Sequence, residues 1–439
     1  MRKPNIIFYF SDQQRHDTMG CYGQKINVTP VLDDLAEKGT LFMNAFTCQP
    51  VCGPARAALQ TGKYPTEVGC FTNNRMLPLS EKTIAKYFND AGYDTAYVGK
   101  WHLASQGPDV NYETTAIPEA YRGGYKDYWM ASDILEFTSR GYNGYVHDIN
   151  NKKHEFIGYR ADCINNYAID FVRNHSGENP FFLFVSQVEP HHQNDRNCHQ
   201  GPDGSKEKYK NFEVPEDLAG ADGDWQLEYP DYLGCCNRLD YNVGRLIDTL
   251  KAKGIYEDTV IIYTSDHGSH FKTRNSEYKR SCHDSSIRIP MIVHGPGFMG
   301  GGKVESLVSL IDVPTTLLDV GGIKIPDDFK GKSLKSLAKN PNMPWRDSVM
   351  VQISESQIGR AIRTQKWKYS VRADGDGWLL PNSEIYYEDF LYDLENDPHE
   401  RTNLVTCAAH AKTRAELERM LLENLQIANE PPAKILSCK

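Results

Sequence analysis

The chain has no long uninterrupted hydrophobic segment, and this limits its class. A membrane-spanning helix needs about 20 consecutive apolar residues, and no such run occurs among the 439 residues. The apolar run at residues 6–10 is interrupted at once by Ser11 and Asp12. It is shorter than the roughly 7–15 apolar residues of a secretory signal. We therefore expect no membrane association and, for the chain as given, a cytoplasmic location.

Ordered cysteine spacing and excess positive charge are also absent. The 11 cysteines are odd in number and contain no C-x-x-C pair. Both a disulfide-stapled domain and a zinc ribbon are therefore excluded, and most thiols should be reduced and buried. A net charge of -9 argues against a general nucleic-acid-binding surface. There is no internal repeat or low-complexity tract.

What the chain does contain is an alternation of apolar runs with amphipathic stretches. This pattern predicts an α/β fold built on a large sheet. The expected strands are 5–10, 95–99, 180–188, 259–265 and 290–295, and the expected helices are 30–39, 80–93, 161–174 and 233–254. The polar segments 104–156 and 193–226 are predicted to be long loops over the functional site.

A change of pattern near residues 337–349 predicts a domain boundary. This stretch has two prolines and little periodicity. We place a catalytic domain at 1–340 and a smaller α+β domain at 341–439. Within the second domain, segments 348–354, 359–371 and 388–394 predict antiparallel strands, and 410–429 predicts a closing helix.

Four predicted strands run into unusual polar groups. These groups are Ser11-Asp12-Gln13, Gly99-Lys100-Trp101-His102, Glu189-Pro190-His191-His192 and Ser265-Asp266-His267-Gly268. Ligands of open α/β sheets bind outside the carboxyl ends of the strands, so these ends predict one shared pocket. Taken singly, each residue is explained as a turn residue, a surface histidine or a solvated lysine. Their conjunction at four strand ends favours a functional site.

The residue types at these strand ends indicate two kinds of chemistry. Oxygen donors with one imidazole suit a hard divalent cation such as Ca²⁺ or Mg²⁺ better than structural zinc, and these donors are Asp12, Gln13, Asp266 and His267. Cationic and proton-carrying groups suit an oxyanion, and these are Arg56, Lys100, His102 and His191. Arg56 lies in the first turn of a helix predicted to begin near Pro54, where free N–H groups also favour an anion.

Several motifs together resemble the sulfatase family, within the alkaline-phosphatase-like superfamily. The motifs are Cys52-Gly53-Pro54-Ala55-Arg56 with Thr61-Gly62, then Gly99-Lys100-Trp101-His102, Ser265-Asp266-His267-Gly268 and Arg288-Ile289-Pro290. Segments 360–370 and 391–404 are similar to the small sulfatase domain. The resemblance covers nearly the whole chain. It implies a large mixed sheet flanked by helices, followed by a C-terminal α+β domain with an antiparallel sheet.

The resemblance implies that Cys52 is a precursor. In this family a maturation enzyme oxidises the signature cysteine to formylglycine, an aldehyde. One hydroxyl of the hydrated aldehyde attacks sulfur, and the other then loses its proton and expels sulfate, which is covalent catalysis with a built-in release step.

Further roles follow from the same resemblance. The metal ligands would be Asp12, Gln13, Asp266, His267 and residue 52, holding Ca²⁺, with Mg²⁺ or Mn²⁺ as alternatives. The sulfate would be clamped by Lys100, His191 and Lys279. Arg56 would stabilise the hydrated aldehyde, and His102 would accept the proton during sulfate release. Ala55 and Gln13 depart from frequent family choices, Ser and Asp. Because of these two differences, the identities of the maturation enzyme and of the metal ion stay open.

The substrate is expected to be a small sulfated compound, a sulfated hexose or N-acetylhexosamine. Segment 267–288 should cross the pocket and is rich in directional hydrogen-bonding groups, which sugars need. Its substrate-contact candidates are Arg274, Glu277 and His283. One alternative is a phosphonate monoester or phosphodiester hydrolase, and another is an arylsulfatase or choline sulfatase. The last is a non-catalytic anion- or glycan-binding relative. The leaving alcohol and the oligomeric state stay open.

Overall fold

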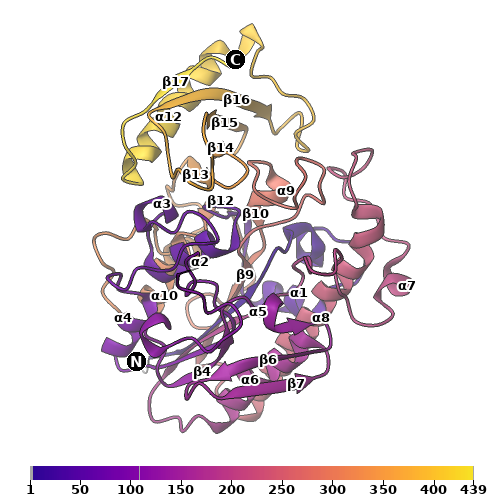
Figure 1. Cartoon of the computed structure of the whole chain (residues 1–439), viewed down its shortest axis with the longest axis vertical. Coiled ribbons are helices and arrows are strands. Elements are labelled where there is room, and N and C mark those ends of the chain that lie inside the picture. Colours follow the sequence, from indigo (N-terminus) through magenta and orange to yellow (C-terminus); the bar gives the residue numbers. More distant parts are fainter. Residues whose placement is uncertain (1–2, 108, 439) are drawn as a thin grey trace.

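The computed structural model describes residues 3–107 and 109–438, which form two sheets with helices around them (Figure 1). The large sheet has 12 strands and the C-terminal sheet has 5 among the described residues. In this part of the chain, no helix is both long enough and apolar enough to cross a membrane. All eleven cysteines are free thiols, as expected from their irregular spacing.

The large sheet is mixed, with a parallel centre. Its strand order is β10-β2-β11-β9-β1-β8-β3-β4-β6-β5, with β12 beside β2 and β7 beside β6. The strands are β1 (Asn5–Ser11), β2 (Thr40–Phe46), β3 (Asp94–Lys100), β4 (Tyr128–Ser132), β5 (Ser139–Arg140), β6 (Asn143–Asp148), β7 (Lys153–Ile157), β8 (Phe181–Ser186), β9 (Thr259–Ser265), β10 (Arg288–Ile289), β11 (Met291–His294) and β12 (Gly302–Ser309). Strands β9, β1, β8 and β3 run parallel, so their carboxyl ends meet at one edge.

Helices cover both faces of this sheet, which explains why its central strands are apolar throughout. In β1, Phe8 and Phe10 pack into one core, while Ile7 and Tyr9 pack into the other. The first core also takes side chains from α2 (Cys52–Thr61), α4 (Ile84–Asp90) and α10 (Asp312–Val320), and the second from α1 (Pro30–Lys38), α6 (Arg160–Asn174) and α8 (Trp225–Ala252). Shorter helices are α3 (Pro65–Val68), α5 (Leu135–Thr138), α7 (Ser205–Tyr209), α9 (Asp284–Ile287) and α11 (Lys335–Lys339).

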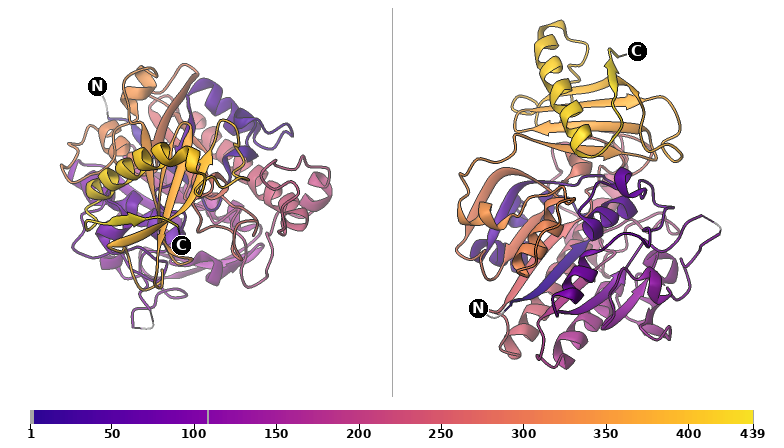
Figure 2. Two further views of the ribbon diagram at one scale, coloured as in Figure 1. Left: turned by 90° about the horizontal axis from the view of Figure 1, so that it is seen from above. Right: turned by 90° about the vertical axis from the view of Figure 1, so that its left-hand side faces the viewer.

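The C-terminal sheet is antiparallel over four strands, and a fifth strand joins its edge in parallel. The strands are β13 (Ser348–Ile353), β14 (Ile358–Thr364), β15 (Trp367–Ala373), β16 (Ile385–Asp393) and β17 (Lys434–Leu436). Helix α12 (Ala411–Ile427) crosses one face of this sheet (Figure 2) and buries Leu417, Leu421 and Leu425, which are spaced one turn apart. The predicted fold class is confirmed. The boundary after residue 340 falls in the loop between α11 and β13 and stays a prediction.

The C-terminal sheet is attached to the loop that precedes α2. The backbone N–H of Gln352 donates to the carbonyl of Cys48 over 2.8 Å. The side-chain amide of Gln49 donates to the hydroxyl of Ser354 over 2.6 Å. Residue 52 is therefore held from the C-terminal side of the molecule as well as by its own helix.

The structure corrects the prediction that residues 104–156 form a loop. This segment contains β4, α5, β5, β6 and β7, which extend the large sheet at its edge. The strands are short, and only one of the five residues of β7 is buried. Their apolar pattern is therefore weak in the sequence. Segment 193–226 also contains α7, and α8 begins at Trp225 rather than near 233, with Pro230 inside it.

Candidate functional site

Two parallel strands bring their acidic ends together. Ser11 at the end of β1 pairs with Ser265 at the end of β9, so the next residues, Asp12 and Asp266, lie at the same edge. The backbone N–H groups of Gln13 and His267 donate to Oδ1 of Asp266 over 2.9 and 2.8 Å. Gln13 takes a left-handed conformation, with φ 68°. This turn orients the Asp266 carboxylate through its backbone.

Helix α2 begins with Cys52 directly against this pair of strand ends. One ligand atom from each of Asp12, Cys52, Asp266 and His267 lies within 4.8 Å of the others, and all four residues are buried. The Cys52 sulfur is 3.4 Å from Oδ1 of Asp12 and 3.4 Å from Nε2 of His267. Gln13 is 1% exposed and lines the same cavity as Cys52.

The chemistry of this cluster fits a divalent cation. Burial, and then the charge of Asp12, raise the pKa of Asp266 to about 7, because two carboxylates lie close together away from water. Among the described residues, no group hydrogen-bonds to Oδ2 of Asp266. A buried carboxylate oxygen without a partner is costly, and a cation between the two carboxylates would remove both penalties. An oxygen-rich donor set is the kind that Ca²⁺ and Mg²⁺ prefer.

Cationic side chains surround the other side of residue 52. The Nζ atom of Lys279 lies 2.8 Å from the Cys52 sulfur and 3.1 Å from Nε2 of His191. Burial opposes ionisation of Cys52, but Lys100, Lys279 and His267 outweigh it and hold the pKa of the thiol well below its ordinary value. The site therefore favours negative charge at residue 52 and beside it.

Lys100 and Arg56 both bind Asp12. Its Oδ2 atom lies 2.8 Å from Nζ of Lys100 and 3.1 Å from a terminal guanidinium nitrogen of Arg56. Burial and the Cys52 sulfur oppose ionisation of Asp12, yet Lys100, His191 and Arg56 keep its pKa well below the ordinary value. Asp12 is thus ionised and faces both the metal-ligand cluster and the cations.

A glycine at the end of β3 permits this placement of Lys100. Gly99 has φ 104°, and a Cβ there would lie 1.9 Å from the carbonyl oxygen of Ser186 on β8. Only glycine lets the strands approach so closely. His102 follows with φ 59°, its backbone N–H donates to the carbonyl of Asp133 over 2.7 Å, and its side chain lines the cavity.

Glu136 is a site residue that the sequence did not reveal. Its Oε1 atom lies 2.5 Å from Nζ of Lys100 and 3.6 Å from Nδ1 of His191. Burial raises the pKa of this carboxyl, but Lys100 and His191 lower it to about 2. Glu136 lies on α5, inside the segment expected to be a loop, and no motif surrounds it. A carboxylate next to an anion site is visible only in three dimensions.

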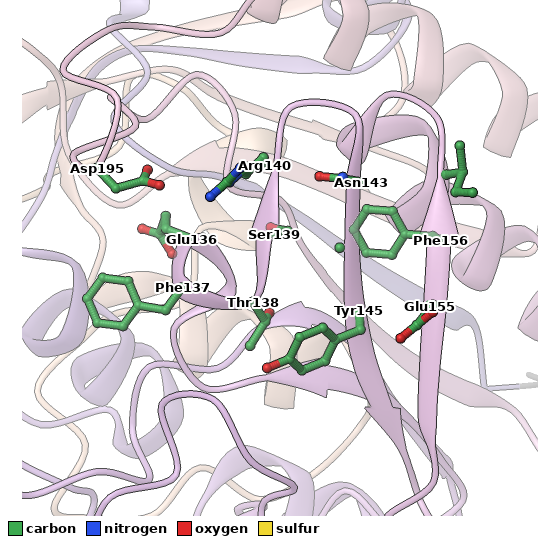
Figure 3. Close-up of a pocket in the computed structure, with 12 residues that line it drawn as sticks. Glu136, Phe137, Thr138, Ser139, Arg140, Asn143, Tyr145, Glu155, Phe156 and Asp195 are labelled. Atoms are coloured by element: carbon green, nitrogen blue, oxygen red, sulfur yellow. The ribbon is translucent and has the colours of Figure 1, made fainter.

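The cluster opens into a cavity of about 190 Å³. Its outer lining is mainly polar and aromatic, and comprises Asn73, Asn74, Glu113, Ile134, Phe137, Asn194, Glu277, Tyr278, Arg280 and Trp378. A larger cavity of about 760 Å³ lies next to it (Figure 3) and shares Glu136 and Phe137 with it. The larger cavity is lined mostly from α5 to β7, and the metal-ligand cluster does not reach it.

Two of the three substrate-contact candidates lie away from the cavity. The guanidinium of Arg274 donates to the backbone carbonyls of His399 and Glu400, so it ties the two domains together. His283 is buried between Ser281 and Tyr392. Their placement corrects the expectation that they contact substrate. Glu277 does line the cavity.

Comparison with known proteins identifies the family. The Sulfatase family model matches residues 4–323, and the model described as N-sulphoglucosamine sulphohydrolase, C-terminal, matches residues 276–427. An ulvan-active sulfatase of Formosa agariphila is 30% identical over 445 residues, which cover 96% of this chain and 81% of that protein. An N-acetylglucosamine-6-O-sulfatase of Bacteroides thetaiotaomicron is 25% identical over 508 residues, covering 96% and 86%.

A solved structure shows the same fold. The protein BT4656, in complex with its substrate D-glucosamine-2-N,6-O-disulfate, superposes with a TM-score of 0.82 at 24% sequence identity. The match covers 98% of each chain. The arrangement of a large mixed sheet with a smaller C-terminal sheet is therefore shared.

Proposed function

This chain belongs to the sulfatase family of sulfate-ester hydrolases, and we propose that it removes sulfate from a sulfated sugar. The reaction would use a formylglycine made from Cys52 and a bound divalent cation. The observation that carries this proposal is the position of Cys52. It begins α2 within 3.4 Å of Asp12 and His267, and 2.8 Å from Lys279.

The modified residue and the cation would supply the reactive group. The Cys52 sulfur stands where an oxygen of hydrated formylglycine would lie, and that oxygen would be the nucleophile. A cation held by Asp12, Asp266, His267 and the amide of Gln13 would lower the pKa of this oxygen and polarise the sulfate. Ca²⁺ is the cation that the oxygen-rich ligands favour, with Mg²⁺ or Mn²⁺ as alternatives.

The other residues of the chain would bind the anion and move a proton. Lys279, Lys100 and His191 would hold sulfate oxygens, since they converge on the cavity beside residue 52. Arg56 would fix the Asp12 carboxylate and stabilise charge at residue 52. The imidazole of His102, on the cavity wall, would accept a proton from residue 52 as sulfate leaves.

The sugar assignment is supported by the lining of the cavity and by the relatives. Outside the cationic centre, the wall offers the amides of Asn73 and Asn194 and the carboxylate of Glu277, with aromatic rings between them. Such walls recognise hydroxyl and acetamido groups. Two relatives are named for action on ulvan and on N-acetylglucosamine sulfate. A sulfated hexose or N-acetylhexosamine is the substrate we propose.

The first experiment tests the maturation of Cys52. The chain is co-expressed with a formylglycine-generating enzyme, and mass spectrometry of the peptide spanning residue 52 should show aldehyde in place of thiol. Turnover should track the aldehyde fraction, and Cys52→Ala should abolish it. Cys407→Ser, a change at a thiol outside the cavity, should not. Full activity of a sample whose residue 52 is entirely thiol would refute the mechanism.

The substrate class is tested with a panel on the matured protein. Sulfated monosaccharides and disaccharides are compared with an aryl sulfate, choline sulfate and a phosphonate monoester by kcat/KM. A sugar sulfate should be the best substrate. Faster turnover of the phosphonate would instead indicate a phosphonate monoester hydrolase, and equal turnover of the aryl sulfate would remove the sugar assignment. Absence of all turnover in matured protein would leave a binding protein.

A further inference from the structure

We propose that Trp378 and Arg280 form a subsite for the leaving alcohol at the mouth of the catalytic cavity, and that the buried Glu355 holds Arg280 in place. The ligand of this subsite is a pyranose ring whose single anion is the sulfate being removed. The inference rests on the proposed action on sugars and names the residues that recognise the sugar.

Trp378 brings an aromatic surface from the second domain into the cavity. It lies between β15 and β16 and lines the same cavity as Cys52. Its side chain is 38% exposed, so part of the ring is open to a ligand. A large indole ring left open at the mouth of a cavity offers a flat apolar surface, and the C–H face of a pyranose ring can pack against it.

The loop that carries Trp378 is fixed in place. The backbone N–H of Glu355 donates to the carbonyl of Gly377 over 3.1 Å, and that of Trp378 donates to Oδ1 of Asp376 over 2.8 Å. A Cβ at Gly377 would come within 2.6 Å of the carbonyl oxygen of Gln357. The indole is thus held before substrate arrives, which lowers the entropy lost on binding.

Arg280 lies against Trp378 and carries two carboxylate partners. Its guanidinium carbon is 5.5 Å from the centre of the indole. Its Nε atom is 2.5 Å from Glu355, and a terminal nitrogen is 3.0 Å from Glu277. Arg280 and Glu277 line the cavity and offer donors and acceptors, while the buried Glu355 holds Arg280 and offsets its positive charge. Such a rim suits hydroxyl and acetamido groups, and it disfavours a second sulfate or a carboxylate on the same sugar.

Arg280 and Glu355 are among the ten described non-glycine residues with a positive φ. Both have left-handed backbones, with φ 66° and 65°. Such a conformation is strained for residues that carry a Cβ. The Ser356 hydroxyl donates to the Arg280 carbonyl over 2.7 Å, and the Glu355 carboxylate pairs with the Arg280 guanidinium, so the two strained residues are joined. Residues with strained backbones are found more often at active sites and ligand-binding sites than elsewhere.

A short chain of hydrogen bonds connects this rim to the nucleophile. Glu355 Oε1 accepts from the backbone N–H of Asn73 over 2.7 Å. The side-chain oxygen of Asn73 accepts from the backbone N–H of Gly53, next to Cys52, over 2.9 Å. The subsite and residue 52 therefore keep a fixed separation. That separation would decide which position of the sugar ring presents its sulfate to residue 52.

The test compares variants of matured enzyme on the best monosulfated sugar from the panel and measures inhibition by inorganic sulfate. Trp378→Ala should lower kcat/KM for the sugar about tenfold or more, mainly through KM, because the pyranose ring loses the apolar surface on which it packs. Its inhibition constant for inorganic sulfate should stay within twofold, since the anion site is untouched. Trp378→Tyr should recover most of the loss.

Matched controls separate this role from a structural one. Leu379→Ala changes the next residue, which is 68% exposed and does not line the cavity, and should behave as wild type. Arg280→Gln should raise the preference for the monosulfated sugar over its disulfated analogue at least threefold, because it leaves two carboxylates without their cation. Unchanged sugar kinetics in Trp378→Ala, or equal losses of sugar turnover and sulfate binding in Trp378→Tyr, would overturn the subsite. A wild-type enzyme that turns over no sugar sulfate would instead refute the proposed function.

Discussion

The ammonium nitrogen of Lys279 lies 2.8 Å from the sulfur of Cys52, although 227 residues separate them in the sequence. Cys52 belongs to the start of α2, whereas Lys279 lies in the segment that leads from β9 to β10. The contact places a full positive charge where a nucleophile at residue 52 would meet the sulfate group. Charge that develops on sulfate oxygens would be stabilised there in a buried site.

Lys279→Ala should reduce kcat/KM by a factor of about 10²–10³, the usual loss for one preorganised donor to a developing anion. The control is Lys272→Ala, since Lys272 pairs with Asp224 at 2.9 Å outside the cavity. Mass spectrometry must show equal aldehyde content in both variants. A loss below threefold in Lys279→Ala would remove this residue from the reaction.

Asp266→Asn should lose the divalent cation. Calcium added at about 100 times its dissociation constant should stabilise the wild type by about 2.7 kcal/mol, because the cation binds only the folded cluster. The melting temperature of the variant should not respond to calcium, and elemental analysis should find less than one tenth of the wild-type metal. Asp224→Asn, outside the cluster, is the control. Full metal content in Asp266→Asn would show that the site lies elsewhere.

Glu136→Gln should separate anion binding from turnover. Its carboxylate holds Lys100 at 2.5 Å but also repels an incoming sulfate. Removing the charge should therefore tighten inhibition by inorganic sulfate severalfold, while kcat falls about tenfold because Lys100 then keeps only its contact with Asp12. Glu155→Gln, on the neighbouring cavity, provides the comparison. Weaker sulfate binding in Glu136→Gln would contradict this positioning role.

Asp240 should make the stability of the fold depend on pH. Burial raises the pKa of this carboxyl to about 7, although the N–H groups of Val31 and Leu32 lower it in part. The folded state therefore holds a proton that the unfolded state releases near pH 4, so this residue stabilises the fold at low pH. That contribution should fade between about pH 4 and 7, by at most roughly 4 kcal/mol.

The measurement for Asp240 is urea unfolding of the wild type and Asp240→Asn across this pH range. The stability of the wild type relative to the variant should fall as the pH rises. The control is Asp248→Asn, at an exposed position on the same helix. A relative stability that rises with pH would show that the carboxyl is ionised throughout.

The sequence predicts the centre of the site better than its rim. Asp12, Lys100 and Asp266 follow strongly apolar strands, and parallel strands must end at a common edge, so their meeting follows from local pattern alone. Glu136 and Trp378 follow no such rule. Glu136 lies on the short helix α5 between the edge strands of the large sheet, and Trp378 lies in a loop of the C-terminal sheet. Their positions depend on how these segments pack against the rest of the chain, which a local pattern does not contain.

The contact between Gln352 and the carbonyl of Cys48 has a consequence for the order of events during synthesis. Residue 52 is 1% exposed in the finished fold, so an enzyme that oxidises its side chain must act before the fold closes. Roughly 300 residues lie between this cysteine and the strand that closes over it, and a ribosome needs on the order of 15–60 s to add them. Maturation of residue 52 would then compete with the growing chain, and slower translation should give a larger active fraction.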